Sequence, residues 1–264
     1  MTGARGQTLA LLQARSASTR LPGKVLKPLA GEPMILRQLE RVRRARCLDG
    51  IVVAISDDSS DDDLAIVLAD AGYDYVRGPL EDVLGRFVQA VDEYQPDVVV
   101  RLTADCPLIS PSVMNLVIDR FHASSADYVS NTMRPTYPDG LDVEVVTAAA
   151  LREVAGASSD AHEREHVTLG IYRRTDQFSV ENVVDPSGID NSFMRWTVDT
   201  PEDFAFVAEV YENLYPSKFD YEEVFALLAE RPDLMRTSMD ERRNAALDGV
   251  DTGAMNHSRV QDSS

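Results

Sequence analysis

A polar loop near the amino end of the chain holds a cluster of cationic side chains. It follows the apolar run from Leu9 to Leu12 and carries Arg15, Arg20, Lys24 and Lys27. No Asp or Glu precedes Glu32, although acidic residues outnumber basic ones by 44 to 26 in the whole chain. Small residues between the cations allow backbone N–H groups to surround an anion, and Arg and Lys bind phosphate oxygens strongly. We interpret the loop as a polyphosphate site, with a basic surface loop as the alternative.

Two familiar phosphate-binding motifs do not occur in this loop. Gly23-Lys24 is similar to the end of a Walker loop, but Ser18 stands at the required upstream glycine and Val25 follows the lysine. No G-x-G-x-x-G follows the apolar run either. The loop therefore belongs to neither of these nucleotide-binding classes.

Two aspartates farther along the chain stand at positions suited to a metal ion. Asp105 (T-A-D-C-P) and Asp199 (T-V-D-T-P) each follow an expected strand and shortly precede a proline. Because Mg²⁺ needs few carboxylates and keeps several waters, two aspartates are sufficient to hold it. The alternative for each aspartate is that it caps the helix that follows.

Other reactive side chains are assigned structural roles. The aspartates of 57–63 lack the glycine and the final glutamate of a calcium loop, so we expect them to cap a helix. His162 and His166 are four residues apart on a helix expected at 161–171, but no third zinc ligand accompanies them. Cys106 has no histidine partner and is interpreted as a packing residue.

The first half of the chain alternates between apolar runs and helical patterns. Strands are expected at 9–12, 51–56, 73–77 and 97–103, and helices at 33–42, after 57–63 and at 81–94. This alternation predicts a doubly wound, mostly parallel α/β sheet. Ligands of such sheets bind beyond the carboxyl ends of the strands. The basic loop, the segment from Arg77 to Arg86 and Asp105 are therefore expected at one rim.

The second half follows a different pattern. LDVEVV (141–146) alternates, with its acidic side chains on one side, and predicts an antiparallel strand or a hairpin arm whose acidic face meets solvent or ligand. Further strands are expected at 127–130, 178–182 and 193–198, and helices at 111–121, 148–154, 161–171, 201–214 and 221–230. Thr200 and Pro201 are the expected cap and first residue of the fourth of these helices.

Length and composition favour one domain with terminal extensions. We expect a disordered lead at 1–7, a single domain at 8–234 with a small antiparallel arm at about 131–182, and a mobile polar tail at 235–264. The net charge of −18 argues against nucleic acid or an anionic membrane as a partner. Two isolated cysteines and the lack of a long apolar segment predict a soluble cytoplasmic protein.

Four strings of the sequence resemble one enzyme family. QARSASTRLPGKVLKPL resembles the opening motif of the cytidylyltransferase family, which includes CMP-ketodeoxyoctonate and CMP-sialic acid synthetases. RLTADCPLISP (101–111), PDGLDVEV (138–145) and RWTVDTPEDF (195–204) match in the same order. EREHVT (163–168) makes the resemblance greatest to the spore-coat polysaccharide cytidylyltransferase-like branch. The resemblance implies a Rossmann-like nucleotidyltransferase fold, similar to that of GT-A glycosyltransferases.

The resemblance also assigns roles to individual residues. It implies that Arg15, Lys24, Asp105 and Asp199 are catalytic, and that the two aspartates bind Mg²⁺ or Mn²⁺. The residues that it implies for nucleotide binding are Gln13, Ala14, Arg15, Lys24, Arg77, Asp82, Arg86 and Thr103. The residues that we choose for acceptor binding, from PDGLDVEV and EREHVT, are Asp142, Glu144, Glu163, Arg164 and His166.

The activity implied by the resemblance is transfer of CMP from CTP to a small anionic acceptor, with release of pyrophosphate. The acceptor would be an acidic sugar, a phosphonate or a phosphate, and the enzyme a magnesium-dependent homodimer. Two alternatives stay open. A glycosyltransferase would use a nucleotide-sugar donor, although such enzymes usually show D-x-D and Asp105 is followed by Cys106 and Pro107. A non-catalytic nucleotide-binding module would bind CTP without reaction.

Overall fold

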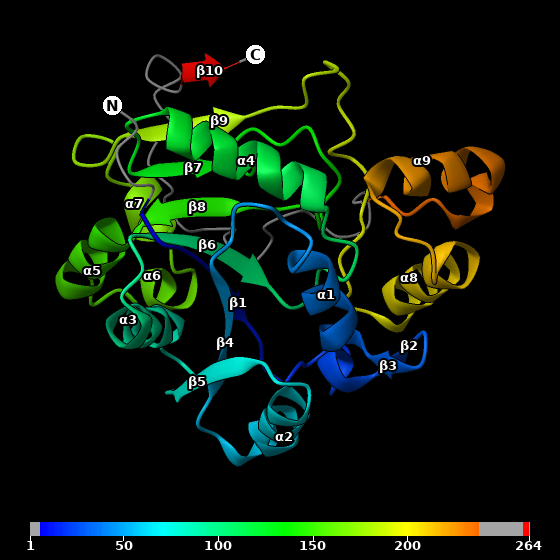
Figure 1. Cartoon of the computed structure of the whole chain (residues 1–264), viewed down its shortest axis with the longest axis horizontal. Helices are drawn as coiled ribbons and strands as arrows, with labels where there is room; N and C mark the ends of the chain where they lie inside the picture. Colours follow the sequence, from blue (N-terminus) through cyan, green and yellow to red (C-terminus); the bar gives the residue numbers. More distant parts are fainter. Residues whose placement is uncertain (1–5, 238–260, 264) are drawn as a thin grey trace.

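The computed structural model describes residues 6–237 and 261–263. They form an eight-stranded sheet in the order β10-β9-β7-β8-β6-β1-β4-β5 (Figure 1). A parallel half contains β1 (Thr8–Gln13), β4 (Gly50–Ser56), β5 (Asp74–Gly78) and β6 (Val98–Thr103). In the other half, β8 (Glu144–Thr147) runs antiparallel to β6 and β7 (Tyr128–Ser130), and β9 (Val180–Val183) and β10 (Gln261–Ser263) continue parallel to β7.

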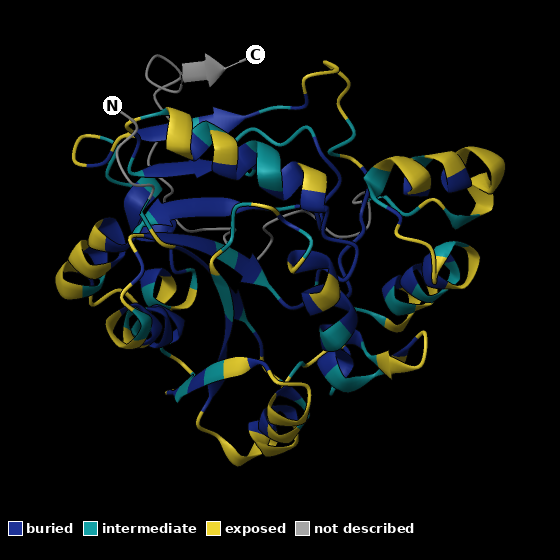
Figure 2. Cartoon of the chain, viewed as in Figure 1, coloured by how far each residue is buried: buried dark blue, intermediate teal, exposed yellow. Residues whose placement is uncertain are grey.

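Helices cover both faces of the sheet, and alternate residues of β1 belong to different cores. Leu9 and Leu11 pack with α3 (Val83–Tyr94), α5 (Ala148–Ala157) and α7 (Leu169–Tyr172). Ala10 and Leu12 pack with the opposite layer, which contains α1 (Met34–Val42), α2 (Asp62–Asp70), α4 (Pro111–Ala123), α8 (Pro201–Leu214) and α9 (Tyr221–Glu230). The central strands are buried, the edge strand β5 is partly exposed, and the outer helix faces are exposed (Figure 2). Apolar runs therefore form strands here because helices cover them on both sides.

This architecture confirms the fold class expected from the sequence. A small antiparallel sheet is also present, formed by β2 (Pro28–Leu29) and β3 (Glu32–Pro33). The expected antiparallel strand near 141–146 lies inside the main sheet as β8. Its acidic residue Glu144 is buried, contrary to the expected orientation toward solvent or ligand. Segments 131–142 and 184–198 run beside each other past the strand ends, as in the bond from Asp139 N to Met194 O at 2.9 Å.

Three local predictions are wrong. Segment 193–198 is not a strand, because only single bridges, Asp139 to Arg195 and Met194 to Thr237, join it to other segments. The helix expected at 161–171 is divided into α6 (Ala161–Glu165) and α7, because Val167 adopts a positive φ of 33° between them. Pro33 precedes α1 as its cap residue instead of occupying the first turn.

The chain termini fall partly outside the described residues. Of the expected lead, residues 1–5 are outside, and the Gln7 N–H donates to Asp97 at 2.8 Å. Of the expected tail, residues 238–260 and 264 are outside, whereas Gln261–Ser263 pair with β9. None of the described helices is long and apolar enough to cross a membrane.

Candidate active site

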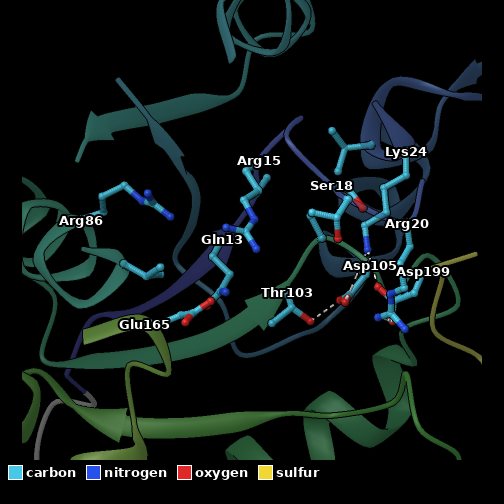
Figure 3. A pocket seen from close by; sticks show the side chains of 15 residues that line it. Gln13, Arg15, Ser18, Arg20, Lys24, Arg86, Thr103, Asp105, Glu165 and Asp199 are labelled. Carbon is cyan, nitrogen blue, oxygen red and sulfur yellow. Dashed lines mark hydrogen bonds and ion pairs between the residues drawn. The ribbon is translucent and has the colours of Figure 1, made fainter. Parts of the chain in front are cut away.

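A polar cleft opens beyond the carboxyl ends of β1 and β6, the location that a parallel sheet favours for ligands. The loop after β1, the loop after β6, the start of α3, the end of α6 and Asp199 in the segment leading to α8 contribute to it (Figure 3). Its lining residues are Gln13, Ala14, Arg15, Ser18, Thr19, Arg20, Lys24, Val25, Val83, Arg86, Thr103, Ala104, Asp105, Glu165 and Asp199. Segments far apart in sequence therefore meet at one rim.

A buried aspartate shapes the basic loop. Asp61, which is 0% exposed, accepts the Ser16 N–H at 2.6 Å and the Ser56 N–H at 3.0 Å. The loop closes on itself through the Gly23 N–H, which donates to Ser16 O at 3.0 Å. Gly23 has a φ of +67°, a conformation that glycine adopts without the usual steric cost. The turn leads directly into the 3₁₀ helix η1 (Lys24–Leu26) and directs Lys24 into the cleft.

Lys24 joins the two candidate metal-binding aspartates. Its Nζ donates to Asp199 Oδ1 at 2.8 Å and to the Val198 carbonyl at 2.7 Å, and it lies 3.8 Å from Asp105 Oδ2. Lys24 is only 9% exposed. Two carboxylates that come within 4 Å of one ammonium are close enough to face one bound cation. The predicted meeting of Lys24, Asp105 and Asp199 is therefore confirmed in position.

Neither aspartate serves as a helix cap. Thr200 caps α8 by accepting the Asp203 N–H at 3.2 Å, and Asp203 Oδ2 accepts the Thr200 N–H at 2.9 Å. Ser110 caps α4 by accepting the Val113 N–H at 3.1 Å. The capping alternative is thus excluded for both, and each carboxylate lines the cleft.

Cations surround Asp199 on several sides. Arg195 Nη2 donates to Asp199 Oδ2 at 2.7 Å, and Arg20 Nη2 lies 3.1 Å from the same oxygen. Burial alone would raise the pKa of Asp199, but Lys24, Arg20 and Arg195 together hold that pKa below its ordinary value. The carboxylate is therefore ionised at neutral pH. Asp105 Oδ1 accepts a hydrogen bond from the Thr103 hydroxyl at 2.6 Å.

The donor set of this cleft fits Mg²⁺ or Mn²⁺ bound together with a nucleotide. Both ions prefer oxygen ligands, and Mg²⁺ in phosphate sites is usually held by one or two carboxylates, with phosphates and waters completing its shell. Asp105 and Asp199 supply two such carboxylates. No group of three or more His, Cys, Asp or Glu side chains suited to a metal occurs among the described residues. A site built entirely from protein ligands is therefore not found in that part of the chain.

Most residues expected to bind nucleotide line the cleft, but two do not. Arg77 bonds the Ser56 carbonyl at 3.0 Å and pairs with Asp62 at 2.8 Å, away from the lining. Asp82 caps α3 by accepting the Gly85 N–H at 2.8 Å and pairs with Arg164 at 2.6 Å. The others on the cleft wall are Gln13, Ala14, Arg15, Lys24, Arg86 and Thr103.

None of the five residues expected to bind the acceptor is part of the cleft lining. Glu163 is 4% exposed and pairs with Arg174 at 2.9 Å, and Arg164 pairs with Asp82. Glu144 is buried against Arg101, and Asp142 is partly buried. His166 follows the end of α6, and burial lowers its pKa. Their acceptor role stays a prediction.

Three important residues of this region were missed. Glu165 lines the cleft and stands in EREHVT between Arg164 and His166, two of the residues expected to bind the acceptor. Arg195 opens the string RWTVDTPEDF and bonds Asp199, so the motif itself contained the signal. Asp61 could not be distinguished from the neighbouring aspartates of 57–63, because only the fold shows which of them reaches the basic loop.

Together, the parallel sheet, the cationic loop and the two facing aspartates define a nucleotidyltransferase. Residues 9–240 match the cytidylyltransferase family, and the chain belongs to that family. It is 32% identical over 231 residues to the spore coat polysaccharide biosynthesis protein SpsF of Bacillus subtilis strain 168, covering 85% of this chain and 95% of the relative. The predicted family is confirmed.

Other relatives agree with this assignment. The 3-deoxy-manno-octulosonate cytidylyltransferase of Anaeromyxobacter dehalogenans strain 2CP-C is 29% identical over 233 residues, covering 73% of this chain and 93% of the relative. A cytidylyltransferase from Leptospira borgpetersenii superposes with a TM-score of 0.82 at 27% identity, covering 88% of this chain and 98% of the other. CMP:2-keto-3-deoxy-manno-octonic acid synthetase complexed with CTP shares the fold, with a TM-score of 0.60 at 16% identity and coverage of 78% and 99%.

Proposed function

We propose that this protein transfers CMP from CTP to an acidic sugar and releases pyrophosphate, with Mg²⁺ or Mn²⁺ as cofactor. The observation that carries the proposal is the approach of Lys24 to both Asp105 and Asp199 in a cleft lined by Arg15 and Arg20. The names of the relatives, among them 3-deoxy-manno-octulosonate cytidylyltransferase, support an acidic sugar as acceptor. A phosphonate or phosphate acceptor belongs to the same proposal.

The reaction moves one cytidylyl group, the CMP unit of CTP, from one oxygen to another. An acceptor oxygen forms a bond to the α-phosphorus of CTP, and the bond from that phosphorus to the bridging oxygen breaks, so that the electron pair leaves with pyrophosphate. Negative charge on the phosphates opposes this attack, and fixed cations reduce that barrier. Arg15, Arg20 and Lys24 line the cleft and would neutralise the departing pyrophosphate.

Asp105 and Asp199 would hold the divalent metal, whose chemistry here is to polarise the phosphate oxygens. Thr103 orients Asp105 through its hydroxyl, and Arg195 orients Asp199. An acceptor hydroxyl must lose its proton during the transfer, whereas an ionised phosphonate oxygen has none to lose. The need for a base therefore depends on the acceptor.

A pyrophosphate-release assay tests this proposal. CTP, UTP, ATP and GTP are each combined with Mg²⁺ and, in turn, with 3-deoxy-manno-octulosonate, N-acetylneuraminate and 2-aminoethylphosphonate. We expect acceptor-dependent pyrophosphate from CTP, and a CMP-linked product of matching amount. In a parallel reaction supplied with a nucleotide sugar, its consumption without any pyrophosphate would instead support a glycosyltransferase. Nucleotide binding with no reaction would support the non-catalytic module. The homodimer and the cytoplasmic location stay predictions.

A further inference from the structure

A buried ion pair lies directly behind the cleft. Arg101 of β6 and Glu144 of β8 stand opposite each other in antiparallel register, and Arg101 Nη1 bonds Glu144 Oε1. Tyr128 donates its hydroxyl to Glu144 Oε2 at 2.6 Å, and the Thr168 hydroxyl donates to the same oxygen. Burial alone would lower the pKa of Arg101, but Glu144 raises it above its ordinary value. The pair is therefore charged, and protein groups occupy both oxygens of Glu144.

The same guanidinium fixes the amide of Gln13. Arg101 Nε and Nη2 both donate to Gln13 Oε1, at 3.1 Å and 2.9 Å. A guanidinium contains only donors, so the amide atom that faces it must be the oxygen. This settles the orientation of an amide whose two ends would otherwise be interchangeable. The Nε2 end of Gln13 is consequently a donor, and no residue of the described ranges 6–237 and 261–263 accepts a bond from it.

Gln13 lines one end of the cleft. Figure 3 shows Gln13 with Arg86 and Glu165 at this end, whereas Lys24, Arg20 and Asp199 lie at the other. Arg86 is already bonded to the carbonyls of Pro79 and Leu80, at 2.8 and 3.1 Å. If the triphosphate and metal occupy the end with Lys24 and the aspartates, the nucleoside extends toward Gln13. The apolar side chains of Ala14 and Val83 line the cleft as well.

We propose that Gln13 donates a hydrogen bond through Nε2 to an oxygen of the nucleoside part of CTP, either a base carbonyl or a ribose hydroxyl. Arg101 is the positioning residue that keeps the amide in this orientation, and Glu144 holds Arg101. The inference rests on the proposed function for the identity of the nucleotide and for the end of the cleft that its triphosphate occupies. It gives Glu144 a role behind the nucleotide site in place of contact with the acceptor.

Calorimetric titration of CTP with Mg²⁺, without any acceptor, tests the contact. Gln13→Met removes the donor without adding charge, and Gln177→Met makes the same change at an exposed site. We expect the Kd for CTP to rise about tenfold in Gln13→Met, as for loss of one buried hydrogen bond, and to stay within twofold of wild type in Gln177→Met. A Kd within twofold of wild type in Gln13→Met would overturn the proposal.

A second variant covers the case in which Gln13→Met does not fold. Gln13→Glu keeps an oxygen for Arg101 but lacks the donor. We expect it to weaken CTP binding also at high salt, because loss of a hydrogen bond is not screened whereas repulsion of the triphosphate is. Full recovery of affinity at high salt would contradict the assignment. Titration with dCTP at high salt identifies the oxygen, because wild type and Gln13→Glu would bind dCTP equally under that screening if the contact is to the 2′-hydroxyl.

The variant Arg101→Lys tests whether Arg101 orients the Gln13 amide or only stabilises the fold. Lysine keeps the charge beside Glu144 but loses the planar fork that bonds Gln13. We expect a smaller rise in Kd than for Gln13→Met, and almost no further rise when both changes are combined, because both remove one interaction. Additive effects would contradict the positioning role. Because only CTP binding is measured, a wild type that binds CTP but releases no pyrophosphate would contradict the proposed function alone.

Discussion

Carboxylates serve opposite purposes in two regions of this molecule. Around Asp199, three cations, Lys24, Arg20 and Arg195, converge on one carboxylate at the wall of an open cleft. Around α6 and α7, Glu163 meets Arg173 and Arg174, and Asp82 meets Arg164. In both regions the named cations are paired with carboxylates. In the first region, however, Lys24 and Arg20 line the open cleft together with Arg15, so an anionic ligand can reach them. Access to the cleft, more than the number of charges, therefore marks the nucleotide site.

The largest expected effect comes from the cleft. Asp105→Asn keeps the shape of the side chain but removes the negative charge that would hold the metal. We expect turnover to fall roughly 10³-fold, because metal stabilisation of the reacting phosphates contributes several kcal/mol. Initial rates of pyrophosphate release measure this. Asp62→Asn, an exposed aspartate at the start of α2, is the control, and equal activity of both variants would contradict the assignment.

The basic loop contains its own matched comparison. Lys24 reaches into the cleft, whereas Lys27 lies over the ring of Phe204 at 5.4 Å. Lys24→Met should weaken CTP binding about tenfold or more, the size expected for a charge-assisted hydrogen bond, and should reduce turnover as well. Lys27→Met should leave the Kd for CTP unchanged. Titration of each variant with CTP measures the two Kd values. Wild-type affinity in Lys24→Met would show that the basic loop is not part of the nucleotide site.

A change in the ion pairs around α6 and α7 should lower the stability of the fold and leave the affinity for CTP unchanged. Glu163→Gln removes the carboxylate that pairs with Arg174 at 2.9 Å, whereas Arg173 keeps its pair with Asp160 at 3.0 Å. Removal of one member of a buried pair costs roughly 3 kcal/mol. We therefore expect a lower free energy of unfolding in denaturant and an unchanged Kd for CTP. A variant as stable as wild type but unable to bind CTP would reverse the distinction between the two regions.

The smallest effect is a pH dependence of that stability difference. Burial would raise the pKa of Glu163, but hydrogen bonds from Ser158, Arg174 and Arg173 hold it below its ordinary value. A carboxylate whose pKa is lower in the folded state contributes stability above its unfolded pKa of about 4.3. This contribution disappears as pH falls through the lower folded value. Unfolding curves of wild type and Glu163→Gln should therefore converge in acid, and a constant difference from pH 7 to pH 3 would contradict the ion pair.

The sequence predicted what depends on local pattern. The alternation of apolar runs with helical patterns predicted the parallel half of the sheet, and Thr200 with Pro201 predicted the start of α8. The convergence of Lys24 and Asp105 also followed, because carboxyl ends of parallel strands share one edge. Asp82 caps α3, close to the start of the helix expected at 81–94.

Cross-strand register explains what the sequence could not predict. Glu144 was expected to face solvent or ligand, but it lies opposite Arg101, a pairing that depends on β8 being inserted between β6 and β7. The break between α6 and α7 occurs at Val167, where no glycine or proline marks it. Segment 193–198 has the apolar residues of a strand but only isolated bridges to its neighbours. Each of these features depends on residues distant in sequence.

The metal dependence of CTP affinity tests the central claim most directly. CTP is titrated into wild type, Asp105→Asn and Asp199→Asn, each with Mg²⁺ and with a chelator. We expect Mg²⁺ to strengthen CTP binding strongly in wild type and only slightly in both variants. If both variants keep the full Mg²⁺ effect, the two aspartates do not meet a metal around the triphosphate, and the account of this cleft is wrong.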